Sequence, residues 1–292
     1  MGISLNPATI LSGQGIDVSS LVQEIINKQS GVLTEWQSEA STLATQAGLL
    51  EGFNNNLTSL ASAVSVLADP AGPLSDLTTD SSQAVTAVNN FVTAYNTLIS
   101  DINQQYVVDP ATDNEGPLGS DISVRSLQSS LLTDAAYAVT GNDGYVNLAT
   151  LGISTNDDGT LSVDTTTLNN VLSKDPTAFQ NFFQNSSGTG FANNFNTDLN
   201  NLTDPVTGVL NADLAQNSAQ TQSLNSDISN FQTNLAAEQQ QLTQQYDAVN
   251  ASLDSYPLLL QAVTEVLGSL GTTVSSTTGA TVPGSPILTG GL

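Results

Sequence analysis

The chain has 292 residues, with three basic residues, 27 acidic residues and no histidine, so its net charge is −24. Binding to nucleic acid requires clustered Lys and Arg side chains that neutralise phosphates, and attachment to an anionic lipid surface requires the same cations. The composition therefore argues against both kinds of partner. Because the chain contains no cysteine, it also has no disulfides, thiolate nucleophiles or Cys-ligated metals.

No apolar run in the sequence approaches the ~20 residues of a membrane-spanning helix. Residues 1–15 carry no Lys or Arg and so lack the charged start of a secretory signal. We therefore expect a soluble chain that reaches the outside of a cell, if at all, without a recognisable cleaved signal. Residues 1–16 show no hydrophobic period and are predicted to be disordered.

A long heptad pattern follows and predicts a helical coiled-coil leg over residues 17–68. Asp17 is the expected N-cap of this helix, with Ser19 or Ser20 as the alternative cap. The expected interface residues of this helix are Val22, Ile25, Val32, Trp36, Leu43, Leu50 and Leu57. Gln29 and Asn54 also fall on the apolar stripe, where they either fix the register of the pairing or are simply solvated.

A second heptad pattern predicts another leg helix over residues 206–270, with a gap in the stripe around Glu238 and Gln239. The expected interface residues here are Leu224, Ile228, Phe231, Leu235, Leu242, Tyr246, Val249, Leu253, Leu260, Val263, Leu267 and Leu270. A helix this long with one narrow stripe needs a partner helix, from this chain or another. Pro257 interrupts the pattern, so the helix is expected to bend or to break there.

Between the two legs, residues 69–79 form a short proline-containing linker and residues 80–205 a small body. Helices are predicted over 82–104 and from Ser120 or Asp121 to about Ala138, with Ile122 directed inward. On either side of Asn156-Asp157-Asp158-Gly159, apolar and polar residues then alternate with a period of two, which predicts a β-hairpin.

Asp164 and Asp175-Pro176 open two further short helices of the body. Residues 271–292 are rich in Ser, Thr and Gly and are predicted to be a disordered tail. The expected fold class is mainly α, with long antiparallel terminal helices forming a coiled-coil leg and a small α+β body that contains one β-hairpin.

Residues that could carry chemistry are few. If the Asn156–Gly159 stretch were a calcium loop, Ser154 and Thr165 would stand where Asp and Glu are needed, so we interpret it as a turn. A serine nucleophile would lack a base, since there is no histidine and neither Lys28 nor Lys174 has a partner motif. Acidic residues fall mostly at helix caps and turns. The sequence therefore predicts no enzyme, no metal and no cofactor.

Several motifs resemble, in order and spacing, those of the flagellar filament capping protein family, also called flagellar hook-associated protein 2. One is Gly15-Ile16-Asp17-Val18-Ser19-Ser20-Leu21-Val22, which opens the first long helix. The others are Phe91 to Ile99, Gly116 to Asp121, Leu151 to Ser154, Asp158 to Asp164, and Asp175-Pro176 followed by Phe182-Phe183. Together the motifs span most of residues 15–270.

The resemblance implies a secreted protein, exported through the flagellar type III apparatus with the help of an export chaperone. It implies a ring-shaped homo-oligomer, usually a pentamer, at the distal tip of the flagellar filament. There it would retain flagellin, promote its polymerisation, and meet the hook–filament junction protein. The family usually inserts β-rich head domains after the first long helix, whereas here residues 69–79 alone occupy that place.

Two other functions fit the same features. A flagellin-like or hook–filament junction subunit would share long terminal helices but would form open filaments instead of closed rings. A secreted coiled-coil adhesin, active in cell adhesion, would bind a surface without flagellin.

Overall fold

The structure is a computed structural model that describes residues 17–78 and 80–277, with the backbone alone at Pro257 and from residue 269 onward. The chain forms two compact units. The terminal unit combines the residues up to Glu35 with those from Ile228 onward, and the central unit is Trp36–Asp227. The division therefore passes through two long helices, and the predicted domain boundaries at 69–79 and 205 do not coincide with it.

In the terminal unit, helix α2 (Val18–Gln29) packs against part of helix α9 (Val209–Thr277). Asp17 is the N-cap of α2: the backbone N–H of Ser20 donates to its Oδ1 at 3.1 Å, and the Ser20 hydroxyl donates to its Oδ2 at 2.6 Å. These contacts satisfy a free donor of the first turn and hold the pKa of Asp17 below its usual range.

The single helix predicted for residues 17–68 is instead two helices, α2 and α3 (Gly31–Ala68), separated at Ser30. The Ser30 hydroxyl donates to the carbonyl of Asn27 at 2.9 Å and competes with regular helix bonding. Gly31 follows directly, and glycine is disfavoured in a helix by about 1 kcal/mol relative to alanine. A heptad pattern reports the spacing of apolar residues and is insensitive to such a local break.

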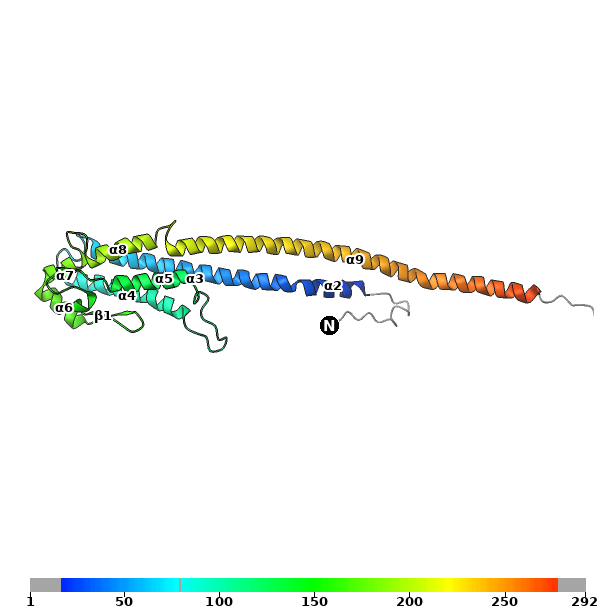
Figure 1. Cartoon of the computed structure of the whole chain (residues 1–292), viewed down its shortest axis with the longest axis horizontal. Coiled ribbons are helices and arrows are strands. Elements are labelled where there is room, and N and C mark those ends of the chain that lie inside the picture. Colours follow the sequence, from blue (N-terminus) through cyan, green and yellow to red (C-terminus); the bar gives the residue numbers. More distant parts are fainter. Residues whose placement is uncertain (1–16, 79, 278–292) are drawn as a thin grey trace, which may run out of the picture. The chain divides into compact units, whose positions relative to one another are not determined.

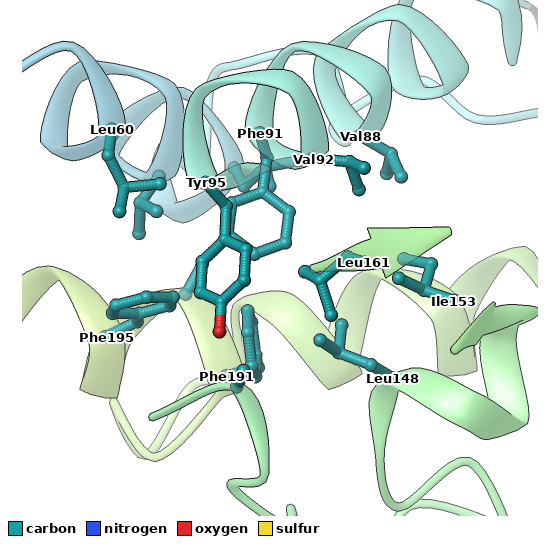
Figure 2. Close-up of a cluster of buried hydrophobic side chains, with 14 of the residues drawn as sticks. Leu60, Val88, Phe91, Val92, Tyr95, Leu148, Ile153, Leu161, Phe191 and Phe195 are labelled. Atoms are coloured by element: carbon teal, nitrogen blue, oxygen red, sulfur yellow. The ribbon is translucent and has the colours of Figure 1, made fainter. Parts of the chain in front are cut away.

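The core of the central unit contains a cluster of aromatic residues from two helices, packed among aliphatic side chains (Figure 2). Helix α4 (Ser82–Gln105) contributes Phe91 and Tyr95, and helix α8 (Phe191–Leu202) contributes Phe191 and Phe195. The ring of Phe91 lies edge-on to those of Phe191 and Phe195, at centroid distances of 5.7 and 6.0 Å. All four side chains are fully buried. Aromatic residues supply the largest apolar area per side chain and hold the helices of this unit together.

A two-stranded antiparallel hairpin lies beside α4, formed by β1 (Ile153–Thr155) and β2 (Leu161–Val163). Asn96 of α4 binds the free edge of β2: its Nδ2 donates to the Leu161 carbonyl at 2.7 Å, and the Leu161 N–H donates to its Oδ1 at 2.6 Å. Gly159 in the turn has a φ of 82°, a conformation that L side chains rarely adopt. The hairpin is therefore fixed by a side chain that supplies both edge hydrogen bonds.

The remaining short elements of the central unit lie near α4 and α8 (Figure 1). They are helix α5 (Ile122–Ala135), the 3₁₀ helix η1 (Leu148–Leu151), and helices α6 (Thr165–Lys174) and α7 (Pro176–Phe183). Asp121 caps α5 and Asp164 caps α6, each accepting from two backbone N–H groups. The predicted fold class, mainly α with a single hairpin, is confirmed.

Three expectations need correction. Ile122 is 82 % exposed and does not point inward, because it lies about 140° around the helix from the buried Leu127. Helix α5 ends at Ala135, short of the predicted Ala138. Helix α9 continues to Thr277, into the predicted tail, since Ser and Thr lower helix propensity by only about 0.5 kcal/mol each and a formed helix propagates readily.

Two expectations fall wholly or partly outside the described residues: disorder of residues 1–16, and disorder of the tail beyond residue 277. At Pro257, the helical assignment of α9 runs through the position without a break. The helix is thus not interrupted there.

Two carboxyl groups meet where α5 packs on α8. Asp134 is only 6 % exposed, and its carboxyl group lies beside that of Asp198. Burial, and then the proximity of Asp198, raise the pKa of Asp134 to about 8. Tyr95 of α4 also faces this group, and burial followed by the Asp134 charge raises the pKa of its hydroxyl. The ionised form of Asp134 is therefore disfavoured in the folded state.

This pair predicts a pH dependence of stability. The contribution of protonated Asp134 is fully present below its unfolded pKa of 3.8 and is lost as the pH rises through about 8. In a chelator-containing buffer, the free energy of unfolding of Asp134→Asn relative to the native chain should therefore rise by about 2.6 kcal/mol between about pH 5 and pH 7, given nearly 1.4 kcal/mol per pH unit. Urea titrations followed by circular dichroism measure this difference, and parallel pH profiles for the two proteins would contradict it.

Candidate assembly surface

The apolar stripe of α9 is covered by α2 in one part of the terminal unit. Leu235 is buried there, and the partly buried side chains around it are Phe231, Leu242 and Tyr246. The residues of α2 that contact this cluster are Val18, Val22 and Ile26. Helix α2 therefore packs on part of α9 within one chain through Val18, Val22 and Ile26. Val22 is the most buried of them, at 2 % exposure, and Ile26 takes the place expected for Ile25.

Two polar residues of the stripes form hydrogen bonds across helices. In the terminal unit, Gln29 Nε2 donates to Glu238 Oε1 at 2.8 Å, at the gap in the apolar stripe of α9. In the central unit, Asn54 Nδ2 of α3 donates to Asn211 Oδ1 of α9 at 3.1 Å. Both bonds are partly buried, so a shift of register would leave polar groups without partners. These contacts favour the register-fixing interpretation of Gln29 and Asn54 over simple solvation.

Beyond Tyr246, the stripe of α9 is exposed in this chain. The exposed fractions are 47 % for Val249, 63 % for Leu260 and 62 % for Leu267. Val263 is also exposed, whereas Leu253 is half-buried. The side chain of Leu270 lies outside the described residues.

Four further large side chains are exposed on the same part of α9 and were not among the predicted interface residues: Tyr256, Leu258, Leu259 and Val266. The run of leucines after Pro257 was visible in the sequence, but it falls outside the heptad spacing. We call this surface, Val249 to Leu267, the distal stripe. Exposed apolar surface is a common feature of interaction sites in soluble proteins.

The other predicted interface residues have different environments. Leu50 and Leu57 are buried in the core of the central unit and are not accessible to a partner molecule. Val32 is 42 % exposed. Half-buried positions are Ile25, Trp36, Leu43, Leu224 and Ile228.

The described residues were also compared with the requirements of a chemical site. Among them, no three or more His, Cys, Asp or Glu side chains come together as a possible metal cluster. Within the same part of the chain, no helix combines the length and apolar character needed to cross a bilayer. The features that stand out are apolar helix faces and polar register pairs, which are characteristic of a structural helical protein.

Comparison with known proteins identifies the family. Residues 69–256 match the family model described as "Flagellar hook-associated protein 2 C-terminus". The B-type flagellar hook-associated protein 2 of Pseudomonas aeruginosa is 32 % identical over 194 residues, covering 63 % of this chain and 39 % of that protein. The flagellar hook-associated protein 2 of Campylobacter jejuni is 26 % identical over 192 residues, covering 59 % of this chain and 30 % of that protein.

The chain belongs to the flagellar hook-associated protein 2 family. It spans well under half the length of the two curated relatives named above. A crystal structure of three domains of the flagellar cap protein FliD from Escherichia coli is 27 % identical, with a TM-score of 0.41, and covers 47 % of this chain and 36 % of that chain. The matched region, 69–256, includes most of the central unit. It ends at residue 256, so the part of the distal stripe after that residue lies outside the match.

The substitution Gln29→Ala tests whether the hydrogen bond from Gln29 to Glu238 holds α2 on α9. Removing the donor leaves the partly buried carboxylate of Glu238 without this partner, which costs about 1 kcal/mol. Amide hydrogen exchange in residues 18–29, measured by mass spectrometry, should then be about fivefold faster if opening is local. Gln37→Ala, at an exposed position of α3, is the matched control and should leave exchange there unchanged. Equal exchange in both variants would show that the pair does not hold α2 on α9.

Proposed function

We propose that this chain is a flagellar filament cap, a structural protein that retains exported flagellin at the filament tip and promotes its polymerisation. The observation that carries the proposal is the distal stripe of α9 in a member of this family. A cap must dock into a growing polymer and release it repeatedly. An exposed apolar helix face supplies that contact through non-directional burial of apolar surface.

The assembled form in this proposal is a ring-shaped homo-oligomer, most simply a pentamer, at the distal end of the filament. Its partners are further copies of the chain, flagellin, the hook–filament junction protein and a type III export chaperone. The role in this proposal is assembly and not catalysis. No cofactor is invoked.

The central unit is the proposed ring-forming body, and the helices of the terminal unit are the proposed leg. Residues 69–79 connect α3 to α4 directly, at the place where the family usually carries inserted head domains. The proposal therefore assigns retention of flagellin to the body and legs alone.

A flagellin-like or junction subunit is the second candidate, because the distal stripe would also suit a subunit packed inside a filament. The two functions differ in self-assembly: a subunit polymerises alone into open filaments, whereas a cap forms closed rings. Electron microscopy of the purified chain distinguishes them. A secreted adhesin is distinguished by binding to surfaces in the absence of flagellin.

Deletion of the gene tests the proposed function in cells. Loss of a cap should leave hooks without filaments, with monomeric flagellin accumulating in the medium, as seen by electron microscopy and immunoblotting. Restoring the native gene should restore filaments. Normal filaments with no leaked flagellin would reject the cap function and leave the family relation as a statement of ancestry.

Substitutions in the distal stripe test its role in assembly. Leu260→Asp, at a position that is 63 % exposed in the single chain, should leave the helix folded but should abolish oligomers, because burying an unpaired carboxylate costs several kcal/mol. Leu253→Asp should do the same. Gln261→Asp adds the same charge outside the stripe and is the matched control.

Mass measured by light scattering after size exclusion reports the result, with circular dichroism as the check on folding. Oligomers of unchanged mass in both leucine variants would remove the distal stripe from the assembly interface. Loss of oligomers in the control as well would point to general charge repulsion instead of a specific contact.

A further inference from the structure

A polar cavity of about 330 Å³ lies between helices α5 and α8 of the central unit. We call it the seam pocket; its lining residues are Ser129, Ser130, Thr133, Asp134, Asp198, Asn201 and Leu202. Apart from Leu202, every lining side chain ends in a group that carries an oxygen atom. Hydroxyl, amide and carboxylate oxygens are the ligands that hard cations prefer.

The seam pocket contains a buried oxygen atom without a hydrogen-bond donor. Asp134 is 94 % buried, with 6 % of its surface exposed, and no group donates to its Oδ2. The group beside it is the carboxyl of Asp198, which is another acceptor when ionised. Two adjacent carboxylates need a positive species between them, since like charges this close cannot both remain ionised without compensation.

The ends of two helices add to this negative potential. Asp134 lies in the last turn of α5, which ends at Ala135, and Asp198 and Asn201 lie near the end of α8, which ends at Leu202. The C-terminus of a helix carries about half a negative charge, so both helix dipoles favour a cation here. None of the lining residues is basic. Arg125 of α5 is engaged elsewhere: its guanidinium donates to the Gly119 carbonyl and lies over the Tyr106 ring.

We propose that the seam pocket binds one divalent cation, Ca²⁺, between the carboxylates of Asp134 and Asp198, with neutral oxygen atoms of the lining completing the coordination. Calcium suits the site better than magnesium, because Ca²⁺ accepts six to eight oxygen ligands in irregular geometry, whereas Mg²⁺ requires a near-ideal octahedron and keeps its waters.

The affinity follows from the ligand set. The described residues hold no cluster of three acidic or other strong ligands, so the site has two charges and otherwise neutral donors. Such a set fits the weak range of about 10⁻⁴ to 10⁻³ M that is typical of extracellular calcium modules. Protonation of either carboxylate would remove a ligand, so binding should strengthen as the pH rises. The inference is independent of the proposed cap function.

Equilibrium dialysis of the full chain with radioactive Ca²⁺ tests the proposal. At about pH 8.5, where the proton competes least, the native chain should bind one ion per chain in addition to diffuse counterions. Asp198→Asn and Asp134→Asn should each weaken this binding at least tenfold. Asp227→Asn, which removes one exposed carboxylate from α9, is the matched control and should leave it unchanged.

Thermal unfolding provides a second measurement. About 10 mM CaCl₂ should raise the melting temperature of the native chain by a few degrees relative to NaCl of equal ionic strength. It should not do so for Asp198→Asn, the half-buried member of the pair, which is the variant to use if Asp134→Asn fails to fold. Equal binding of Ca²⁺ by the native chain and Asp198→Asn would overturn the proposal. So would a melting temperature that depends on pH but not on calcium, since the pair would then hold a proton only.

Discussion

The constraint on which the structure depends is the length of one apolar stripe. Helix α9 has 69 residues, whereas α2 has 12 and α3 has 38. Within the terminal unit, α2 covers the stripe from Phe231 to Tyr246, and the described stripe residues beyond it are exposed except for the half-buried Leu253. The apolar face of α9 is longer than the part that α2 covers, so the rest of that face is exposed to water. The sequence pattern therefore leaves an apolar helix face that a further molecule could cover.

Polar residues inside the stripes determine which residues of the two helices face each other. An uninterrupted apolar seam tolerates slippage, because one leucine packs much like the next. The bond from Gln29 to Glu238 and the bond from Asn54 to Asn211 remove that freedom, since each would be lost after a shift by one turn. One pair lies in each unit, so the register is fixed separately in both. These polar positions weaken the apolar contact between the helices but restrict the helices to one register.

The sequence predicted what depends on local chemistry. Caps at Asp17, Asp121 and Asp164 and the hairpin follow from short-range rules and are present in the structure. It missed what depends on distant contacts or single residues. The break at Ser30 is a local competition that a heptad average hides, and no pattern relates Asn96 to the edge of β2. The same holds for Asp134 and Asp198, which meet only because α5 packs on α8.

The scarcity of basic side chains explains why the carboxyl groups of Asp134 and Asp198 differ from the other acidic groups of the chain. With three basic residues for 27 acidic ones, ion pairs cannot neutralise the acidic side chains of this chain. Most of the described carboxylates with a shifted pKa instead accept hydrogen bonds from backbone N–H and hydroxyl groups at caps and turns, and their pKa values are lowered. Asp134 has no such donor for its Oδ2. A buried carboxylate that the protein does not satisfy is stabilised by whatever positive species the solvent provides, so occupancy of the seam pocket depends on pH and on the surrounding ions.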